Sequence, residues 1–162
     1  MRLLGIDPGF QVTGYSIIDK TVQKTSLVDC GYLKMSSTKA LSERVGIFHD
    51  FFQSKIETQK ISDLALETPF LGKNAQNFLK LGYLRGILYL LANKHALQLH
   101  EFSPSQVKQS LTGFGGASKD QVARVVLRLF PHLAAPDKAD VTDAIAVSLC
   151  GVWHNKNLAH FR

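Results

Sequence analysis

Hydrophobic residues in the first third of the chain follow the pattern of three successive strands. Apolar or β-forming segments cover residues 2–6, 14–18 and 25–35, and the first ends at the turn sequence Asp7-Pro8-Gly9. Asp29 and Gly31 interrupt the third segment, which indicates a bend or a bulge. Because short connections join these segments, the pattern predicts an antiparallel meander.

Beyond residue 40, helical and strand patterns alternate. Apolar residues recur at helical spacing over 41–56 and over about 74–93, and short apolar strands are expected at 61–66 and 97–102. Serines at 103 and 118 have the context of helix N-caps, and a last helix is expected to begin near Asp140. This order predicts an α/β fold in a single domain, residues 1–162, with a five-stranded mixed sheet and helices on both faces.

Composition narrows the class of protein. The 162 residues suffice for one hydrophobic core, and no apolar run reaches the roughly 18 residues of a membrane span. The N-terminus has no secretory signal pattern, and Cys30 and Cys150 lie far apart in apolar segments. We therefore expect reduced thiols and a cytoplasmic protein without a membrane partner. The net charge of +6 favours a polyanionic partner such as nucleic acid.

Four acidic residues stand where α/β folds often place ligand sites. Asp7 and Glu67 each end an apolar strand, while Asp140 and Asp143 are spaced to share one face of the last helix. Each has a structural alternative. Asp7 suits a turn, Glu67 suits a solvated strand end, and the helical pair suits an N-cap followed by a first-turn acid. Spacing alone does not decide whether the four converge.

Convergence of these carboxylates would imply a metal site, because several like charges in one pocket repel each other unless a cation holds them together. Hard divalent ions such as Mg²⁺ prefer oxygen ligands, and a pair of such ions suits phosphodiester hydrolysis. The histidines offer no competing zinc site, since their spacing does not fit one.

A series of short motifs extends along nearly the whole chain, from Met1 to about Cys150. They are Gly5-Ile6-Asp7-Pro8-Gly9, Gly14-Tyr15, Leu66-Glu67, Lys73-Asn74-Ala75, Leu81-Gly82, Arg85-Gly86, and the segments 104–108, 116–122 and 140–146. In this order they resemble the RuvC family of Holliday-junction resolvases.

The resemblance implies a ribonuclease H-like fold and a homodimer that makes paired symmetric nicks in four-way DNA junctions, leaving 5′-phosphates, in recombination and repair. It implies a pair of Mg²⁺ ions in each subunit, with Mn²⁺ as a substitute. A branch-migration motor complex is a further partner that the family suggests. By position, the metal-binding catalytic carboxylates are Asp7, Glu67, Asp140 and Asp143, the DNA-binding residues include Lys108 and Lys119, with Lys119 also catalytic, and the aromatic near the junction bases is Phe70.

Several neighbouring residues have two interpretations each. Phe70 either stacks on an unpaired base or anchors its loop. Lys73, Lys80 and Arg85 either meet DNA phosphates or form a solvated helix face. The glycine-rich segment 112–119 is expected to clamp DNA at a helix N-terminus, or to be a plain connector.

A dimer surface is expected on the apolar face of the 74–93 helix, at Leu81, Leu84 and Leu88. Two other functions stay open at this point. One is a ribonuclease H-like nuclease of ribosomal RNA processing, against which the Lys108 and Lys119 segments argue, and the other is a non-catalytic junction-binding module. An actin-like ATPase is not expected, because that fold needs a second such domain and the chain has 162 residues.

Overall fold

Five strands form one mixed sheet in the computed structural model, which describes residues 1–69 and 75–158. The strands are β1 (Arg2–Asp7), β2 (Val12–Lys20), β3 (Thr25–Lys34), β4 (Asp63–Glu67) and β5 (Gln98–Phe102), in the spatial order β3-β2-β1-β4-β5. The first three are antiparallel neighbours, and β4 and β5 continue the sheet in parallel from β1. The predicted meander and mixed sheet are confirmed.

The predicted irregularity in the third strand is also present. Ile17 of β2 pairs with Asp29, whereas the next residue, Ile18, pairs with Leu27. Val28 is therefore the extra residue of a β-bulge in β3. Since β3 is an edge strand, this bulge disturbs no further pairing.

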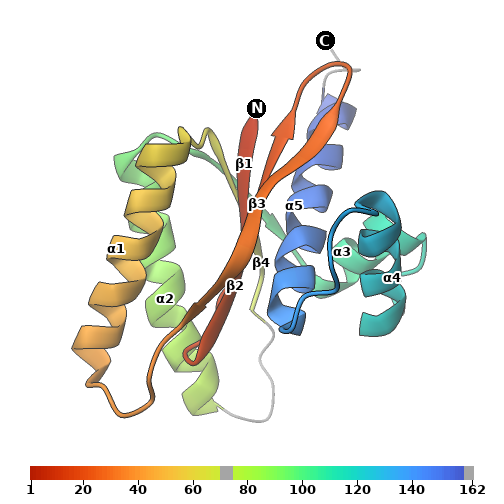
Figure 1. Ribbon diagram of the computed structural model, residues 1–162. Helices are drawn as coiled ribbons and strands as arrows, with labels where there is room; N and C mark the ends of the chain where they lie inside the picture. Colours follow the sequence, from red (N-terminus) through yellow and green to blue (C-terminus); the bar gives the residue numbers. More distant parts are fainter. Residues whose placement is uncertain (70–74, 159–162) are drawn as a thin grey trace.

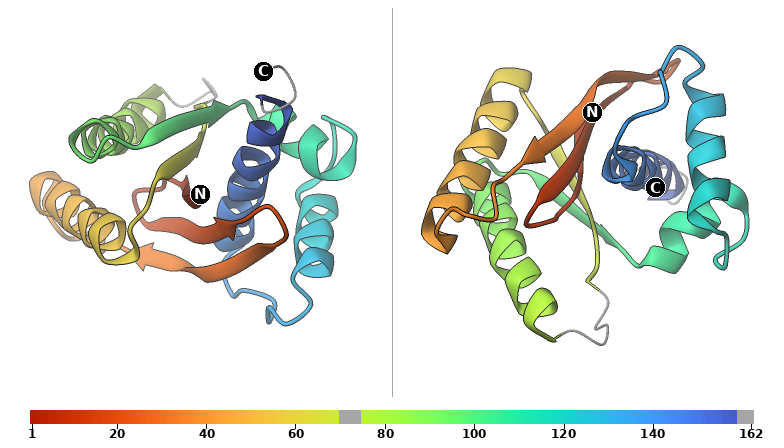
Figure 2. Two further views of the ribbon diagram at one scale, coloured as in Figure 1. Left: turned by 90° about the horizontal axis from the view of Figure 1, so that it is seen from above. Right: turned by 60° about the horizontal axis from the view of Figure 1, so that its bottom comes forward.

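Helices cover both faces of the sheet, as predicted (Figures 1 and 2). One face carries α1 (Leu41–Gln59) and α2 (Ala75–Lys94), which lie side by side. The other face carries α5 (Ala139–Leu158), and the short helices α3 (Pro104–Thr112) and α4 (Lys119–Leu129) pack against α5 from outside.

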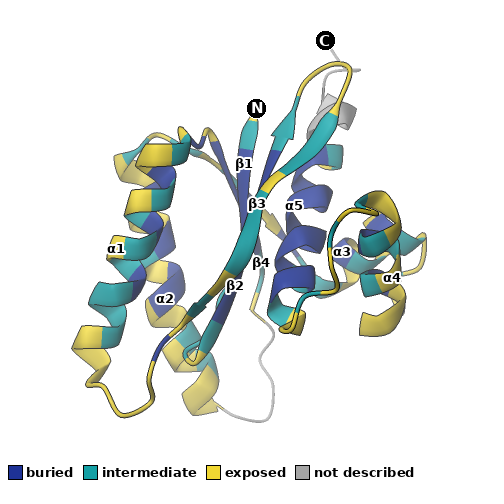
Figure 3. Cartoon of the chain, viewed as in Figure 1, coloured by how far each residue is buried: buried dark blue, intermediate teal, exposed yellow. Residues whose placement is uncertain are grey.

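Each face of the sheet has its own hydrophobic core. On the α1/α2 side, Phe48, Phe52, Leu84 and Leu88 are fully buried against β1, β2 and β4 (Figure 3). On the other side, α5 is buried around almost its whole circumference at residues 144–152, because it lies between the sheet and the α3/α4 pair. An all-round apolar helix is the expected result of such an environment.

The predicted dimer surface on α2 is wrong for Leu84 and Leu88, whereas Leu81 is partly exposed. Leu84 and Leu88 have no exposed surface and face the sheet. A second apolar stripe of α2 faces outward instead, and its side chains are 58% exposed at Leu79, 43% at Tyr83 and 50% at Leu90. The helix is apolar on both sides, so periodicity alone does not say which side faces the core.

The helix starts agree closely with the sequence. The Ser103 and Ser118 side chains accept hydrogen bonds from the backbone N–H groups of Gln106 and Gln121, and both form complete capping boxes. Cys30 and Cys150 are free thiols, as predicted. Over the ranges that the structure describes, no helix is long and apolar enough to cross a bilayer.

Candidate active site

Asp7 and Glu67 leave the sheet at the same edge. Asp7 is the last residue of β1 and Glu67 the last residue of β4. These strands are parallel neighbours in which Ile6 pairs with Leu66, so the two carboxylates follow equivalent positions. The carboxyl end of adjacent parallel strands is a common place for a ligand site. The structure therefore brings these two residues together, which their spacing in the sequence left open.

Glycine and serine residues on β1 and β2 let α5 approach this edge. Gly14 pairs with Asp7, and a Cβ atom on Gly14 would lie 1.9 Å from the backbone oxygen of Asp140. Deeper in the core, the Ser16 hydroxyl donates to the carbonyl oxygen of Ala144 at 3.1 Å. Only a residue without a side chain fits at position 14 while α5 stays in place. The close approach places the first turns of α5 beside Asp7.

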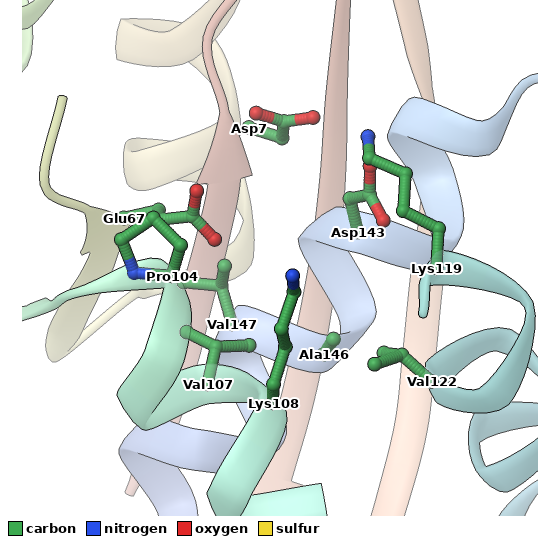
Figure 4. Close-up of a pocket in the computed structure, with 10 residues that line it drawn as sticks. All are labelled: Asp7, Glu67, Pro104, Val107, Lys108, Lys119, Val122, Asp143, Ala146 and Val147. Atoms are coloured by element: carbon green, nitrogen blue, oxygen red, sulfur yellow. The ribbon is translucent and has the colours of Figure 1, made fainter. Parts of the chain in front are cut away.

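Three of the four acidic residues border one pocket of about 170 Å³ (Figure 4). Asp7, Glu67 and Asp143 lie around its mouth, and Lys108 and Lys119 reach toward it from α3 and α4. Its remaining lining consists of small or apolar side chains, which are Pro104, Val107, Val122, Ala146 and Val147. A polar rim over an apolar floor fixes the orientation of a charged ligand better than an open surface does.

Asp140 lies apart from this pocket. It borders a neighbouring groove of about 690 Å³ together with Arg44 and Lys80. Its charge still reaches the site, because it contributes to raising the pKa of Asp7. The structure thus brings Asp7, Glu67 and Asp143 together and leaves Asp140 at the border between the two cavities.

The carboxylates perturb one another strongly. The pKa of Asp7 is raised from 3.8 to about 7. Burial is the largest cause of this shift, followed by the charges of Asp143, Glu67 and Asp140. Burial and the charge of Asp143 also raise the pKa of Glu67. In the part of the chain that the structure describes, no group donates a hydrogen bond to the side chains of Asp7 or Glu67. Acidic groups whose pKa is raised in this way are a signature of functional sites.

Positive charges partly offset this repulsion, since Lys119 acts on both Asp7 and Glu67, and Lys108 and Arg85 act on Glu67. The Nζ atom of Lys119 donates a hydrogen bond to Oδ2 of Asp143 at 2.8 Å, and this contact is the main cause that raises the pKa of Lys119. Lys119 is the first residue of α4, directly after the capping serine, so its backbone is fixed. Lys108 rises toward the pocket from α3, which lies below it in Figure 4.

The donor set suits a hard divalent cation. The oxygen atoms of Asp7, Glu67 and Asp143 surround a solvent-accessible pocket and carry more negative charge than Lys119 neutralises. Across residues 1–69 and 75–158, no three His, Cys, Asp or Glu side chains are already gathered as ligands of one ion. The carboxylates would therefore have to turn toward a bound cation, which single-bond rotations of the side chains allow.

The family model of the crossover junction endodeoxyribonuclease RuvC matches residues 3–151, almost the whole chain. The chain belongs to the RuvC family. Among its curated relatives, the RuvC protein of Chlorobium phaeobacteroides is 40% identical over 159 residues, which are 98% of this chain and 85% of the relative. That of Prosthecochloris aestuarii is 41% identical over 151 residues, covering 93% and 80%.

Solved structures of RuvC proteins have the same fold. The structure of Thermus thermophilus RuvC in complex with a Holliday junction substrate superposes with a TM-score of 0.89 at 27% identity, covering 97% of this chain and 96% of that one. The yeast mitochondrial Holliday junction resolvase superposes with a TM-score of 0.73 at 15% identity, covering 99% and 81%, which shows a shared fold. The ribonuclease H-like fold predicted from the motifs is confirmed.

Some residues of the RuvC-family pattern differ from expectation or cannot be placed. Phe70 and Lys73 lie outside the described residues. Lys80 is exposed beside the groove of Asp140, as a phosphate contact requires. Arg85 is only 5% exposed and bonds to protein groups, so its predicted contact with phosphates or solvent is wrong. Arg44, which the sequence analysis did not single out, borders the same groove as Lys80, and its guanidinium donates to the backbone oxygen of Phe10.

Proposed function

We propose that the chain resolves four-way DNA junctions by divalent-metal-dependent hydrolysis of phosphodiester bonds, with catalytic roles for Asp7, Glu67, Asp140 and Asp143. The observation that carries the proposal is the meeting of carboxylates from β1, β4 and α5 with Lys108 and Lys119 around one pocket. Membership of the RuvC family supports junction DNA as the substrate.

The carboxylates have different tasks in this mechanism. Asp7 ends the strand next to that of Glu67 and feels the charges of Asp143 and Asp140, so it would hold metal together with both groups. Glu67 would complete one side, and Asp143 with Asp140 the other. Mg²⁺ is the expected metal, as a pair of ions in each subunit with Mn²⁺ as a substitute. When bound, such ions activate water and stabilise the leaving oxygen.

Lys119 and Lys108 act on the phosphate group. A scissile phosphate that enters the pocket brings negative charge beside the acidic residues, and the two ammonium groups offset it. Lys119 would exchange its bond with Asp143 for a contact with the phosphate. The polarity of cleavage in this proposal leaves a 5′-phosphate. Phe70 and Lys73 remain predicted DNA contacts on the basis of the family pattern.

A homodimer accounts for paired symmetric nicks, because a twofold axis presents two sites to two equivalent strands. The outward stripe of α2 at Leu79, Tyr83 and Leu90 is the proposed contact. It borders an apolar hollow in which Gly82 and Gly86 have open space beside their backbone, so a partner helix has room to approach closely. A cytoplasmic location, a single domain over residues 1–162 and a motor-complex partner stay predictions.

A cleavage assay tests the function. The chain is incubated with a synthetic mobile junction or with linear duplex of the same sequence, in Mg²⁺, Mn²⁺ or EDTA. We expect symmetric nicks in the junction only, requiring metal, and no nicks from the Asp7→Asn variant although it still binds the junction in a mobility-shift assay. Cleavage by Asp7→Asn at the normal rate would refute the site, and cleavage of RNA hairpins in place of junctions would favour the ribosomal RNA alternative.

A further inference from the structure

We infer that Arg85 is a positioning residue for Glu67, which holds the end of β4 in the orientation that the reaction requires. The inference rests on the proposed function of Glu67. Arg85 belongs to α2, on the opposite side of β4 from the pocket of Asp143, and its side chain is 6% exposed. Its guanidinium is engaged by protein groups, so it acts through the protein and not on a substrate phosphate.

The guanidinium group of Arg85 connects three elements. Its Nη1 donates to the backbone oxygen of Glu67, and its Nη2 donates to a carboxylate oxygen of Glu101 on β5. The same Nη2 donates to the Tyr89 hydroxyl at 2.8 Å, and that hydroxyl donates to Glu101 at 2.7 Å. Each of the four polar groups has a partner within the cluster, so the position of the guanidinium is determined from several sides.

The cluster stands at the end of β4, where its pairing with both neighbouring strands stops. The β4–β5 ladder ends with Glu67 opposite Phe102, and the last backbone bond runs from Thr68 N–H to the Phe102 oxygen at 2.7 Å. The carbonyl oxygen of the same peptide unit, that of Glu67, accepts from Arg85, so the Phe102 and Arg85 bonds together hold the peptide that follows the Glu67 side chain. Arg85 also borders a small cavity shared with Asp7 and Glu67. A shift of this peptide would move the Glu67 carboxylate relative to Asp7.

The geometry requires an arginine. A planar fork reaches the Glu67 oxygen with one nitrogen and Glu101 with the other, whereas the single ammonium of a lysine cannot span both acceptors. A lysine at position 85 would keep the positive charge but lose the fork. Arg85→Lys therefore separates the positioning role of the fork from the electrostatic role of a buried positive charge.

The test compares Arg85→Lys with the milder variants Tyr89→Phe and Glu101→Gln. Arg2→Lys is the matched control, because Arg2 also donates to one carboxylate and one backbone oxygen, those of Asp19 and Gln59, at the far end of β1 from the site. For each variant we would measure the junction affinity, the single-turnover nicking rate and the thermal midpoint of unfolding. We would also measure how far the thermal midpoint rises when Mg²⁺ is added without DNA. Mg²⁺-induced stabilisation reports the carboxylate site without DNA or catalysis.

We expect Arg85→Lys to slow nicking by about 10- to 100-fold, as a misplacement of a catalytic group on the order of 1 Å does. Junction affinity should stay near that of the parent, and the Mg²⁺-induced rise should shrink. Tyr89→Phe and Glu101→Gln should lie between the parent and Arg85→Lys, while Arg2→Lys should lose stability without loss of rate. The milder variants keep the inference testable if Arg85→Lys does not fold.

Three outcomes would overturn the inference. One is a folded Arg85→Lys variant with parental rate and parental response to Mg²⁺. Another is a loss of junction affinity that accounts for the whole defect. The last is an equal loss of rate in Arg2→Lys. Failure of the parent chain to nick junctions would instead refute the proposed function, so the two failures are distinguishable.

Discussion

Lys119 donates a hydrogen bond of 2.8 Å to Asp143, joining the first turn of α4 to the first turns of α5 at the mouth of the carboxylate pocket. The Lys119 side chain is 77% exposed, although its amine end lies against an acidic group. An ion pair this open to water contributes little to stability. Its value lies in placing a mobile positive charge beside the acidic residues, where a phosphate would arrive.

Replacing Lys119 by Met should therefore slow nicking much more than it weakens folding or binding. We expect a loss of about 100-fold in the single-turnover rate, the usual effect of removing one group that stabilises transition-state charge. Lys24→Met, which removes an equal charge from the exposed β2–β3 turn, is the matched control for net charge. A similar loss of rate in the two variants would show that only overall electrostatic attraction matters.

The pKa of Asp7 predicts an unusual dependence of stability on pH. Because its folded-state pKa is raised to about 7, the folded state binds more protons than the unfolded state between pH 4 and 7. Stability without metal should thus fall as the pH rises through this window. The full effect would be roughly 4 kcal/mol, and we expect about half, since the pocket admits water.

Thermal unfolding in EDTA measures this effect. Asp7→Asn should be more stable than the parent at pH 8 and equally stable near pH 4, since its amide does not ionise. Mg²⁺ at pH 8 should raise the midpoint of the parent and leave that of Asp7→Asn nearly unchanged. Parallel pH profiles for the two proteins would contradict the assignment of the raised pKa to Asp7.

The sequence was sufficient for those parts of the site that depend on local pattern. Strand ends at Asp7 and Glu67 could be recognised, and the parallel pairing of β1 with β4 then made them neighbours. The helix starts at Ser103 and Ser118 followed from capping residues whose partners lie only three positions away. Local interactions of this kind leave a direct trace in the sequence.

Other features depend on which side of an element meets the core, and periodicity did not decide them. Arg85 looked like one more basic residue of an amphipathic helix, yet its position on α2 turns it inward toward Glu101. The orientation of α2 on the sheet also explains why Leu84 is buried and Tyr83 is exposed on the same helix. When both faces of a helix carry apolar residues, the sequence pattern fits more than one orientation of the helix on the sheet. Only the packing against the sheet decides which face is buried.

Gly14 provides a steric test of how α5 is placed. A Cβ atom at this position would lie 1.9 Å from the Asp140 backbone oxygen, so Gly14→Ala must push the start of α5 away from Asp7. We expect a loss of about 1–3 kcal/mol in unfolding free energy, as for other overpacked sites. The nicking rate should also fall, because Asp140 and Asp143 move together with α5. This fall should be larger than the loss of folded protein at the assay temperature would cause.

Gly46→Ala is the control for this substitution. Gly46 lies within α1, and nothing stands within 4 Å of the position its Cβ would occupy. Alanine should therefore stabilise the protein by about 0.5–1 kcal/mol through helix propensity and leave nicking unchanged. A Gly14→Ala variant with parental rate would mean that α5 tolerates the displacement without disturbing the site.

The outward stripe of α2 makes a prediction about assembly. Leu79 and Tyr83 lie one helical turn apart beside the open backbone of Gly82, so lysine at either position would place a charge within the proposed contact. Leu79→Lys and Tyr83→Lys should shift the mass in analytical ultracentrifugation from dimer toward monomer, and paired nicking should change to uncoupled single nicks.

Val22→Lys is the control, because it changes a fully exposed residue of the β2–β3 turn, at 101% exposure, and should leave both the mass and the nicking unaltered. Because this stripe faces away from the sheet, the lysine variants should keep the parental thermal midpoint at low concentration, where dissociation contributes nothing. A dimer that persists in both variants would exclude this stripe as the subunit contact.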